Sequence, residues 1–318
     1  MTDTEALNYL ARRSPSLAQY EPPPAQPPAG GWHWEGAVPQ ALVVHGCSMA
    51  AVPQAAADLF VDVLYPAGCR TILITGGVGR ETPPLWKDLH QRGMTSLFAH
   101  EPWEPDATPT AAILRTQGSE IKPVLDHVDL DMPPNKLRQY CTEADVFLEI
   151  ICARCRERGL KLRFGGNPMV TQATHTLNLL ECGNLRVKCV SAEGDPCIYI
   201  ETASTHTGTN VEYSRTSLKL LLGEEALATP SVVVVQQPQL HLRTTLTWEK
   251  QTGVAPLAWT LQPTEAAVGR PLSEMRKYAL GEYRRIPAYA AADKDFCVLP
   301  ADWAATGAQH ASLLEAEA

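Results

Sequence analysis

The segment ETASTHTGTN, residues 201–210, places many hydroxyl side chains at one turn of the chain. It follows an apolar, strand-like run and precedes an amphipathic stretch, so it lies where a strand ends and a helix begins. One hydroxyl, from Ser204, Thr205 or Thr207, would cap that helix. The remaining hydroxyls favour a ligand, because they donate and accept hydrogen bonds and suit ribose, carboxylate or phosphate. Glu201 would bind a ribose diol or an ammonium group, or it would be a solvated end of the loop.

A glycine-rich turn, TGGVGRET at residues 75–82, follows a second apolar run. Gly76, Gly77 and Gly79 would let the backbone approach a ligand and adopt positive φ. Free amides in such a turn could hold an anion. The turn lacks the GxGxxG pattern and the Lys-Ser/Thr pair of a P-loop. The sequence therefore leaves open a binding loop and a plain strand-to-helix turn.

A third polar segment, QQPQLHLRTT at residues 236–245, brings His241 and Arg243 to the start of a helix. Arg243 could hold a carboxylate or phosphate through two parallel hydrogen bonds. The alternative is a surface arginine paired with Glu249 or Glu212. His241 is either structural or, given its near-neutral ordinary pKa, an acid–base group. The spacing assigns no catalytic residue.

Nine cysteines are scattered along the chain, and Cys152 and Cys155 form a CxxC pair. A redox pair needs the start of a helix, where the helix dipole lowers the thiol pKa. This pair lies late in a helical pattern, so we expect buried thiols instead. No second pair stands at zinc spacing, so no metal site is expected. The odd cysteine count indicates reduced thiols in a cytosol-like compartment.

Apolar runs alternate with helical patterns along most of the chain. This alternation predicts parallel strands joined by right-handed crossovers, with ligands bound beyond the carboxyl ends of the strands. In the helix expected over 211–222, we expect Tyr213, Leu220 and Leu221 to face inward. The expected strands cover 41–46, 71–77, 185–193, 197–201, 231–237 and 255–263, and the other expected helices cover 50–69, 83–93, 142–158 and 240–253.

Composition divides the chain into an extended Pro-rich arm (1–37), an α/β core (38–265) and a helical or irregular extension (266–318). The core contains Pro-rich or enlarged insertions at 101–140 and 160–195. The net charge of −8 argues against a nucleic-acid partner, since phosphates require a basic face. No run of 18 apolar residues and no secretory leader is visible, so we expect a soluble, cytoplasmic protein without membrane contact. The sequence does not give the oligomeric state.

Taken together, four segments resemble the YdcF-like family, part of the superfamily that includes SanA and ElyC. LITGGVGRETPPL is similar to its glycine loop, and TEADVFLE to the start of its glutamate-bearing helix. IYIETASTHTGTNVEYS resembles its E-x-x-S-x-x-T-x-E-N signature, with Thr209 standing where the signature has a glutamate. VVVVQQPQLHLRTTLTWEKQTG resembles the next motif. The likeness covers roughly 38–265, and residues 293–303 resemble the family's C-terminal segment more weakly.

The resemblance implies a Rossmann-like, three-layer α/β sandwich with a mainly parallel sheet, plus insertions and a C-terminal extension. It implies binding of a nucleotide-like small molecule, with S-adenosylmethionine as the first candidate cofactor. It names no catalytic residue. The residues that it places at the site are Gly46, Gly76, Gly77, Gly79, Thr82, Glu143, Glu201, Ser204, Thr207, Asn210, Gln236 and Arg243.

Two other functions stay open. One is an enzyme that acts on a phosphorylated or envelope-precursor-type substrate and uses Glu and His side chains for proton transfer. Thr209 weighs against it, because a hydroxyl cannot replace a carboxylate as a base near neutral pH. The other is a non-catalytic interaction protein whose proline arm and insertions bind partners.

Overall fold

The computed structural model describes residues 38–77, 79, 81–94, 142–160, 186–187, 197–261, 264–292, 298–299 and 303. The expected arm at 1–37 and the first insertion at 101–140 lie outside these residues. Most of the second insertion and of the C-terminal segment that resembles the family also lies outside them.

A six-stranded sheet forms the centre of the described structure, in the order β3-β4-β2-β1-β5-β6. Five strands pair in parallel, and only the two-residue β3 runs antiparallel to its neighbour β4. The chain builds outward from β1 to one edge and then returns to the other side of β1 through β5. This confirms the expected Rossmann-like α/β class and places the switch point between β1 and β5. The strands are β1 Ala41–His45, β2 Thr71–Thr75, β3 Arg186–Val187, β4 Cys197–Glu201, β5 Val232–Val235 and β6 Leu257–Trp259.

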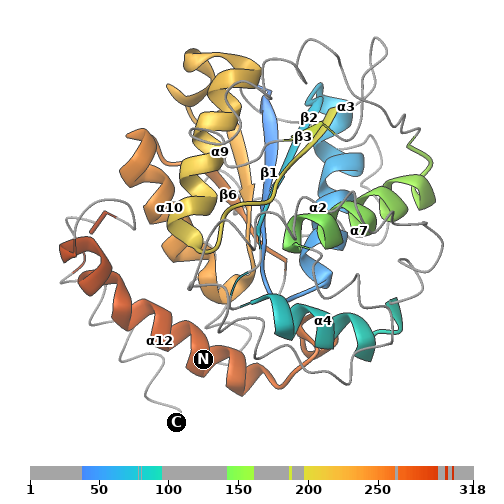
Figure 1. Ribbon diagram of the computed structural model, residues 1–318, viewed down its shortest axis with the longest axis vertical. Coiled ribbons are helices and arrows are strands. Elements are labelled where there is room, and N and C mark those ends of the chain that lie inside the picture. Colours follow the sequence, from blue (N-terminus) through green and yellow to red (C-terminus); the bar gives the residue numbers. More distant parts are fainter. Residues whose placement is uncertain are drawn as a thin grey trace.

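Helices cover both faces of the sheet, which makes three layers (Figure 1). On one side lie α2 and α7, and on the other lie α9 and α10. Across the lower part of Figure 1, beyond the carboxyl ends of the strands, lie α4 and α12. The helices are α2 Ala51–Leu59, the π-helix η1 Phe60–Leu64, α3 Tyr65–Ala67, α4 Thr82–Gln91, α7 Glu143–Glu157, α9 Thr207–Leu222, the 3-10 helix η6 Glu224–Leu227, α10 Pro238–Thr252, α11 Glu265–Val268 and α12 Leu272–Ala291.

Side-chain alternation along the strands produces two apolar cores. Val44 and Ile74 point to the face covered by α2 and α7, whereas Val43 and Leu73 point to the face covered by α9 and α10. Because both faces are covered, each parallel strand is an almost continuous apolar run, as its sequence predicts.

The inward face of α9 differs from the expected one. Val211 and Leu218, seven positions apart, are fully buried against the sheet. Tyr213, Leu220 and Leu221 are only half-buried at the flanks of the helix. The difference arises because the polar side chains of this helix also face inward, so the apolar residues alone do not define its buried face.

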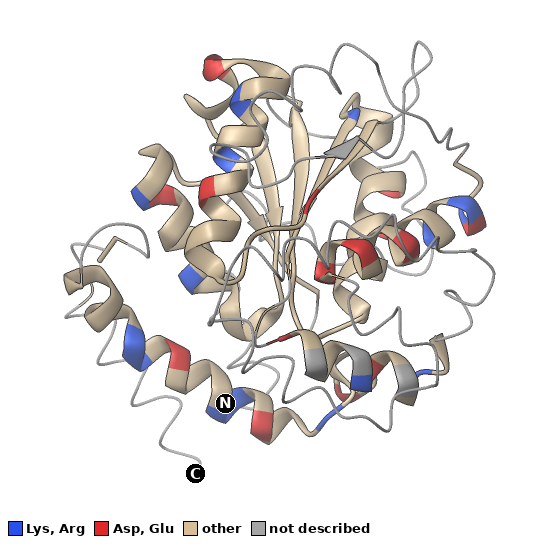
Figure 2. Ribbon diagram, in the orientation of Figure 1, with Lys and Arg blue, Asp and Glu red and all other residues tan. Residues whose placement is uncertain are grey.

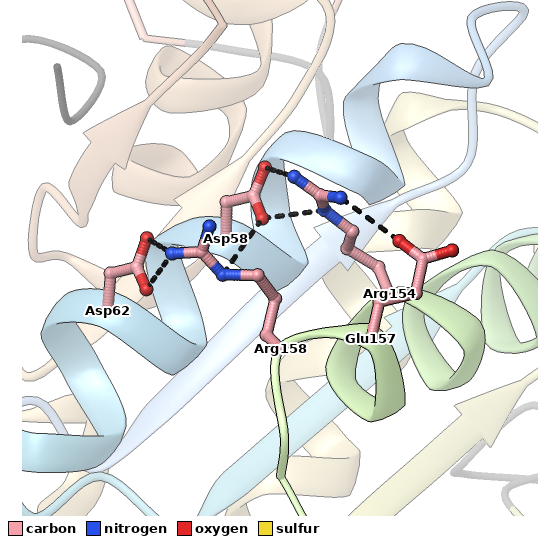
Figure 3. Close-up of polar contacts among 5 residues, drawn as sticks. All are labelled: Asp58, Asp62, Arg154, Glu157 and Arg158. Carbon is pink, nitrogen blue, oxygen red and sulfur yellow. Dashed lines mark hydrogen bonds and ion pairs between the residues drawn. The ribbon is translucent and has the colours of Figure 1, made fainter. Parts of the chain in front are cut away.

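An ion-pair network joins α7 to α2 and η1 (Figure 3). The Arg154 Nε atom lies 2.8 Å from Asp58 Oδ1, and Arg158 pairs with Asp62. Acidic residues gather at the first turn of α7 and basic residues at its last turn (Figure 2), which complements the helix dipole. The network fixes α7 along one side of the sheet and thereby positions its N-terminus at the carboxyl edge.

Candidate functional site

Three segments meet where β2 and β4 end. Gly76 N donates to the Glu201 carbonyl at 3.1 Å, and Gly77 N donates to the Ser204 carbonyl at 2.6 Å. The backbone of Glu143, the first residue of α7, donates to the Gly77 carbonyl at 3.0 Å. The glycine turn, the hydroxyl turn and α7 are therefore in direct contact, although they lie far apart in the sequence.

The glycines of this edge are required by close packing. A methyl group on Gly46 would lie 2.2 Å from Glu143 Oε2, and one on Gly77 would lie 2.5 Å from the Ser204 carbonyl oxygen. Gly76 also has a φ of +147°, a conformation that L side chains rarely adopt. A side chain at any of these positions would therefore displace the Glu143 side chain or the backbone.

The three glycine amides of the turn, which are among its described residues, are not free. The Gly76 and Gly77 amides donate to backbone carbonyls, and Gly79 N donates to Thr82 Oγ1 at 2.8 Å. These amides are used in joining the turn to its neighbours, so an anion cradle built from them does not form in this structure. What the glycines provide is space for the Glu143 carboxyl.

The Glu143 side chain is buried at this junction, with 5 % of its surface exposed. Thr82 Oγ1 donates to Glu143 Oε1 at 2.8 Å. Burial raises the pKa of Glu143 to about 8; the Thr82 hydrogen bond opposes this shift and nearby Glu81 adds to it. At neutral pH the group is therefore mostly a neutral carboxylic acid that can donate a hydrogen bond.

Glu201 organises the hydroxyl turn from inside. Its carboxylate is fully buried rather than solvated, which corrects that alternative reading. Glu201 Oε1 accepts hydrogen bonds from the backbone amides of Ala203 and Ser204. These bonds curve the chain sharply just after β4 and present the following hydroxyls to the rim of the sheet.

The cap of α9 is His206, not one of the hydroxyl residues expected there. His206 Nδ1 accepts from Thr209 N at 3.3 Å, and Thr209 Oγ1 accepts from His206 N at 3.2 Å. None of the three candidate hydroxyls is therefore used as the cap. Thr209, which stands where the family signature has a glutamate, completes the capping box.

Two buried polar atoms near this turn lack a hydrogen-bond partner among the described residues. They are Ser204 Oγ and Asn210 Oδ1, in side chains that are 1 % and 6 % exposed. An unmatched buried polar atom costs about 1–3 kcal/mol, so native structures usually pair such atoms with water or a ligand. These two atoms are unmatched hydrogen-bonding positions close to the junction.

Arg243 lies on the same rim but points at partners in its own chain. Its Nη2 atom donates to Thr207 Oγ1 at 2.6 Å, and its Nη1 atom donates to Glu282 of α12. The alternative prediction, that Arg243 pairs with Glu249 or Glu212, is therefore wrong. Gln236 directly follows β5, and its side-chain oxygen Oε1 accepts a hydrogen bond from the backbone amide of Gln237 at 2.7 Å. This bond shapes the turn into α10.

His241 is a fully buried side chain of α10. Burial lowers its pKa to about 4, so the ring is neutral near pH 7. Its Nδ1 atom has no partner within the described part of the chain. This environment suits a structural histidine better than one that gains a proton near neutral pH.

A series of hydrogen-bonded polar side chains crosses the switch point between β1 and β5. Ser48 Oγ donates to Gln237 Oε1 at 3.1 Å, and Gln237 Nε2 lies 3.5 Å from Glu81 Oε2. Tyr278 of α12 donates to the other oxygen of Glu81 at 3.1 Å. Sequence reasoning did not include Gln237, Glu81 or Tyr278, because no local pattern shows that these positions meet.

Cys152 and Cys155 are both buried in the second half of α7. This agrees with the buried-thiol interpretation and not with a reactive pair at a helix start. Across the described segments, no group of three or more His, Cys, Asp or Glu side chains is arranged to hold a metal ion.

The fold and this edge define a Rossmann-like α/β protein whose polar residues converge at the carboxyl ends of its parallel strands. A comparison of the chain with protein-family models gives no match, and neither does a comparison with curated proteins. Among the helices that are described, none has the length and apolar character needed to cross a membrane.

Proposed function

We propose that this chain binds a nucleotide-like small molecule at the carboxyl edge of its sheet, with S-adenosylmethionine as the first candidate. The resemblance of the four segments to the YdcF-like family suggests this ligand class. The observation that carries the proposal is the pair of open polar atoms, Ser204 Oγ and Asn210 Oδ1, beside the junction of the glycine turn and α7.

In this proposal each residue has a distinct role. Ser204 and Asn210 provide neutral hydrogen bonds to the ligand, because their side chains are buried and unmatched. Glu143, as a neutral acid, donates to an acceptor on the ligand or holds the ribose. Gly46, Gly76 and Gly77 keep the junction narrow, since a methyl group on any of them would displace Glu143 or the backbone.

The test combines binding and stability measurements on Ser204→Ala. Removing an unmatched buried hydroxyl should leave the free protein as stable as the wild type or slightly more stable. The same change should weaken binding of the ligand at least tenfold by isothermal titration. S-adenosylmethionine, S-adenosylhomocysteine, ATP and AMP are the compounds to titrate.

The matched control is Thr205→Ala, because Thr205 lies in the same turn but its side chain is exposed. Its affinity and stability should match those of the wild type. Absence of binding heat and of any thermal shift with all four compounds would refute the proposal. Unchanged affinity in Ser204→Ala would place the ligand elsewhere.

A second candidate is an enzyme that acts on a phosphorylated or envelope-precursor-type substrate. The observation that favours it is Glu143, whose pKa of about 8 would let it act as a general acid near neutral pH. In this case Glu143→Gln should lower turnover by about 100-fold or more. Unchanged turnover in that variant would exclude Glu143 from the chemistry.

A further inference from the structure

Arg243 and Thr207 together resemble a binding site for an anion. Its guanidinium faces Thr207 Oγ1 at the first turn of α9, and a carboxylate completes the arrangement. Guanidinium, hydroxyl and helix N-terminus are the groups that proteins commonly use to bind phosphate or carboxylate. Here the anion is Glu282, a side chain of the same protein.

Glu282 is held at this position from two sides. It is 3 % exposed, and its other oxygen, Oε1, accepts from Arg285 Nη1 at 2.5 Å. A buried carboxylate is costly unless cationic partners surround it, so the pairing with Arg243 is an integral part of how α12 packs. The Arg243 side chain also lies over the ring of Tyr289, 5.3 Å from its centroid.

Another contact of α12 helps to hold Glu282 at the carboxyl edge of the sheet. Tyr278, one helical turn earlier, donates to Glu81 at the other side of the switch point. Between α10 and α12 lies a small hollow, partly open to solvent, with a volume of about 10 Å³. Its lining combines the apolar side chains of Leu242 and Ile286 with the Arg243–Glu282 pair. A ligand that reaches this end of the edge meets a neutralised pair and not a free cation.

We propose that Glu282 is a specificity-determining residue that acts as an internal anion. By pairing with Arg243, which also donates to Thr207, it excludes phosphate and carboxylate groups from this end of the site. The ligand class that remains is a nucleoside that brings a neutral or cationic group to the rim, such as a sulfonium, and not a nucleotide phosphate. The ligand class rests on the proposed function, whereas the exclusion of anions by Glu282 does not.

The experiment is a titration with inorganic pyrophosphate at constant ionic strength, in which isothermal calorimetry measures the heat of binding. The wild type should show no measurable binding. Glu282→Gln leaves Arg243 without its internal carboxylate, so pyrophosphate affinity should rise at least tenfold above the detection limit. The control Glu274→Gln removes an exposed carboxylate from the first turn of the same helix and should change nothing.

Two further variants keep the result interpretable. Glu282→Thr removes the charge with a smaller side chain, in case the glutamine variant does not fold; circular dichroism and the unfolding transition decide this. The double variant Glu282→Gln with Arg243→Gln should lose the gained affinity. A folded Glu282 variant without pyrophosphate binding overturns the inference, and so does an equal gain in the Glu274→Gln control.

The same proteins separate the two proposals. If no nucleoside binds the wild type but Glu282→Gln binds pyrophosphate, the proposed function fails and the anion exclusion stands. If nucleosides bind the wild type and ATP binds as tightly as adenosine, the exclusion fails while the proposed function survives.

Discussion

Replacing Glu143 by glutamine should remove a large pH dependence from the stability of this protein. In the folded chain, the pKa of Glu143 is raised from 4.5 to about 8, mainly by burial. The folded state therefore holds a proton that the unfolded chain releases over that range. The stabilising contribution is complete below pH 4.5 and is lost as the pH rises toward 8.

The size of the change in the free energy of unfolding follows from the interval between the unfolded and folded pKa values of Glu143. Each pH unit between the two pKa values lowers the free energy of unfolding by about 1.4 kcal/mol for this one group. Between pH 4.5 and pH 7, the wild type should therefore lose about 3 kcal/mol relative to Glu143→Gln. Glutamine cannot ionise, but its carbonyl still accepts the Thr82 hydrogen bond, so the variant keeps the local packing.

The assay is urea unfolding of both proteins at pH 5, 6, 7 and 8, with the difference between them plotted against pH. Other titrating groups are common to both proteins and cancel in this difference. Glu225→Gln, an exposed carboxylate on η6, is the control and should follow the wild type. Parallel curves for wild type and Glu143→Gln would show that burial does not perturb Glu143, and the reasoning above would be wrong.

Three other changes test separate features of the structure by urea unfolding. Gly77→Ala should destabilise the protein by about 2 kcal/mol or more, because the new methyl group meets a backbone oxygen at 2.5 Å, whereas Gly281→Ala, with open space around it, should be neutral or stabilising. Asp58→Asn breaks the half-exposed network of Figure 3 and should cost about 0.5–1 kcal/mol, less at high salt; an unchanged effect in 1 M salt would contradict this. His206→Ala should cost about 1 kcal/mol through loss of the α9 cap, while Thr205→Ala should cost almost nothing; the reverse order would show that the hydroxyl is the cap.

Much of the fold was predictable because its patterns are local. The runs around Val43, Leu73 and Val234 are apolar throughout, as parallel strands covered on both faces must be. Gly68 and Gly253 end their helices in the left-handed conformation, and Thr142 caps α7, close to the expected helix boundaries at 69, 253 and 142. These features depend on neighbours within a few positions.

The partners at the carboxyl edge were less predictable, because they depend on how distant segments meet. The sequence indicated that Arg243 would face an anion, but it could not show that the anion is Glu282 of α12. It also gave no means to distinguish His206 from the adjacent hydroxyls as the cap of α9, since histidine is an uncommon acceptor at that position. The burial of Glu201 follows from the order of the strands, which places β4 against β2.

The assembly of the carboxyl edge from distant segments has a kinetic consequence. Thr82 and Glu143 are 61 positions apart, and Ser48 and Gln237 are 189 positions apart. Such long-range pairings form slowly, because closing a long loop costs entropy before any contact compensates for it. The edge should therefore mature only at the end of folding, and a chain that has just emerged from synthesis should acquire any affinity for a small molecule in its final step.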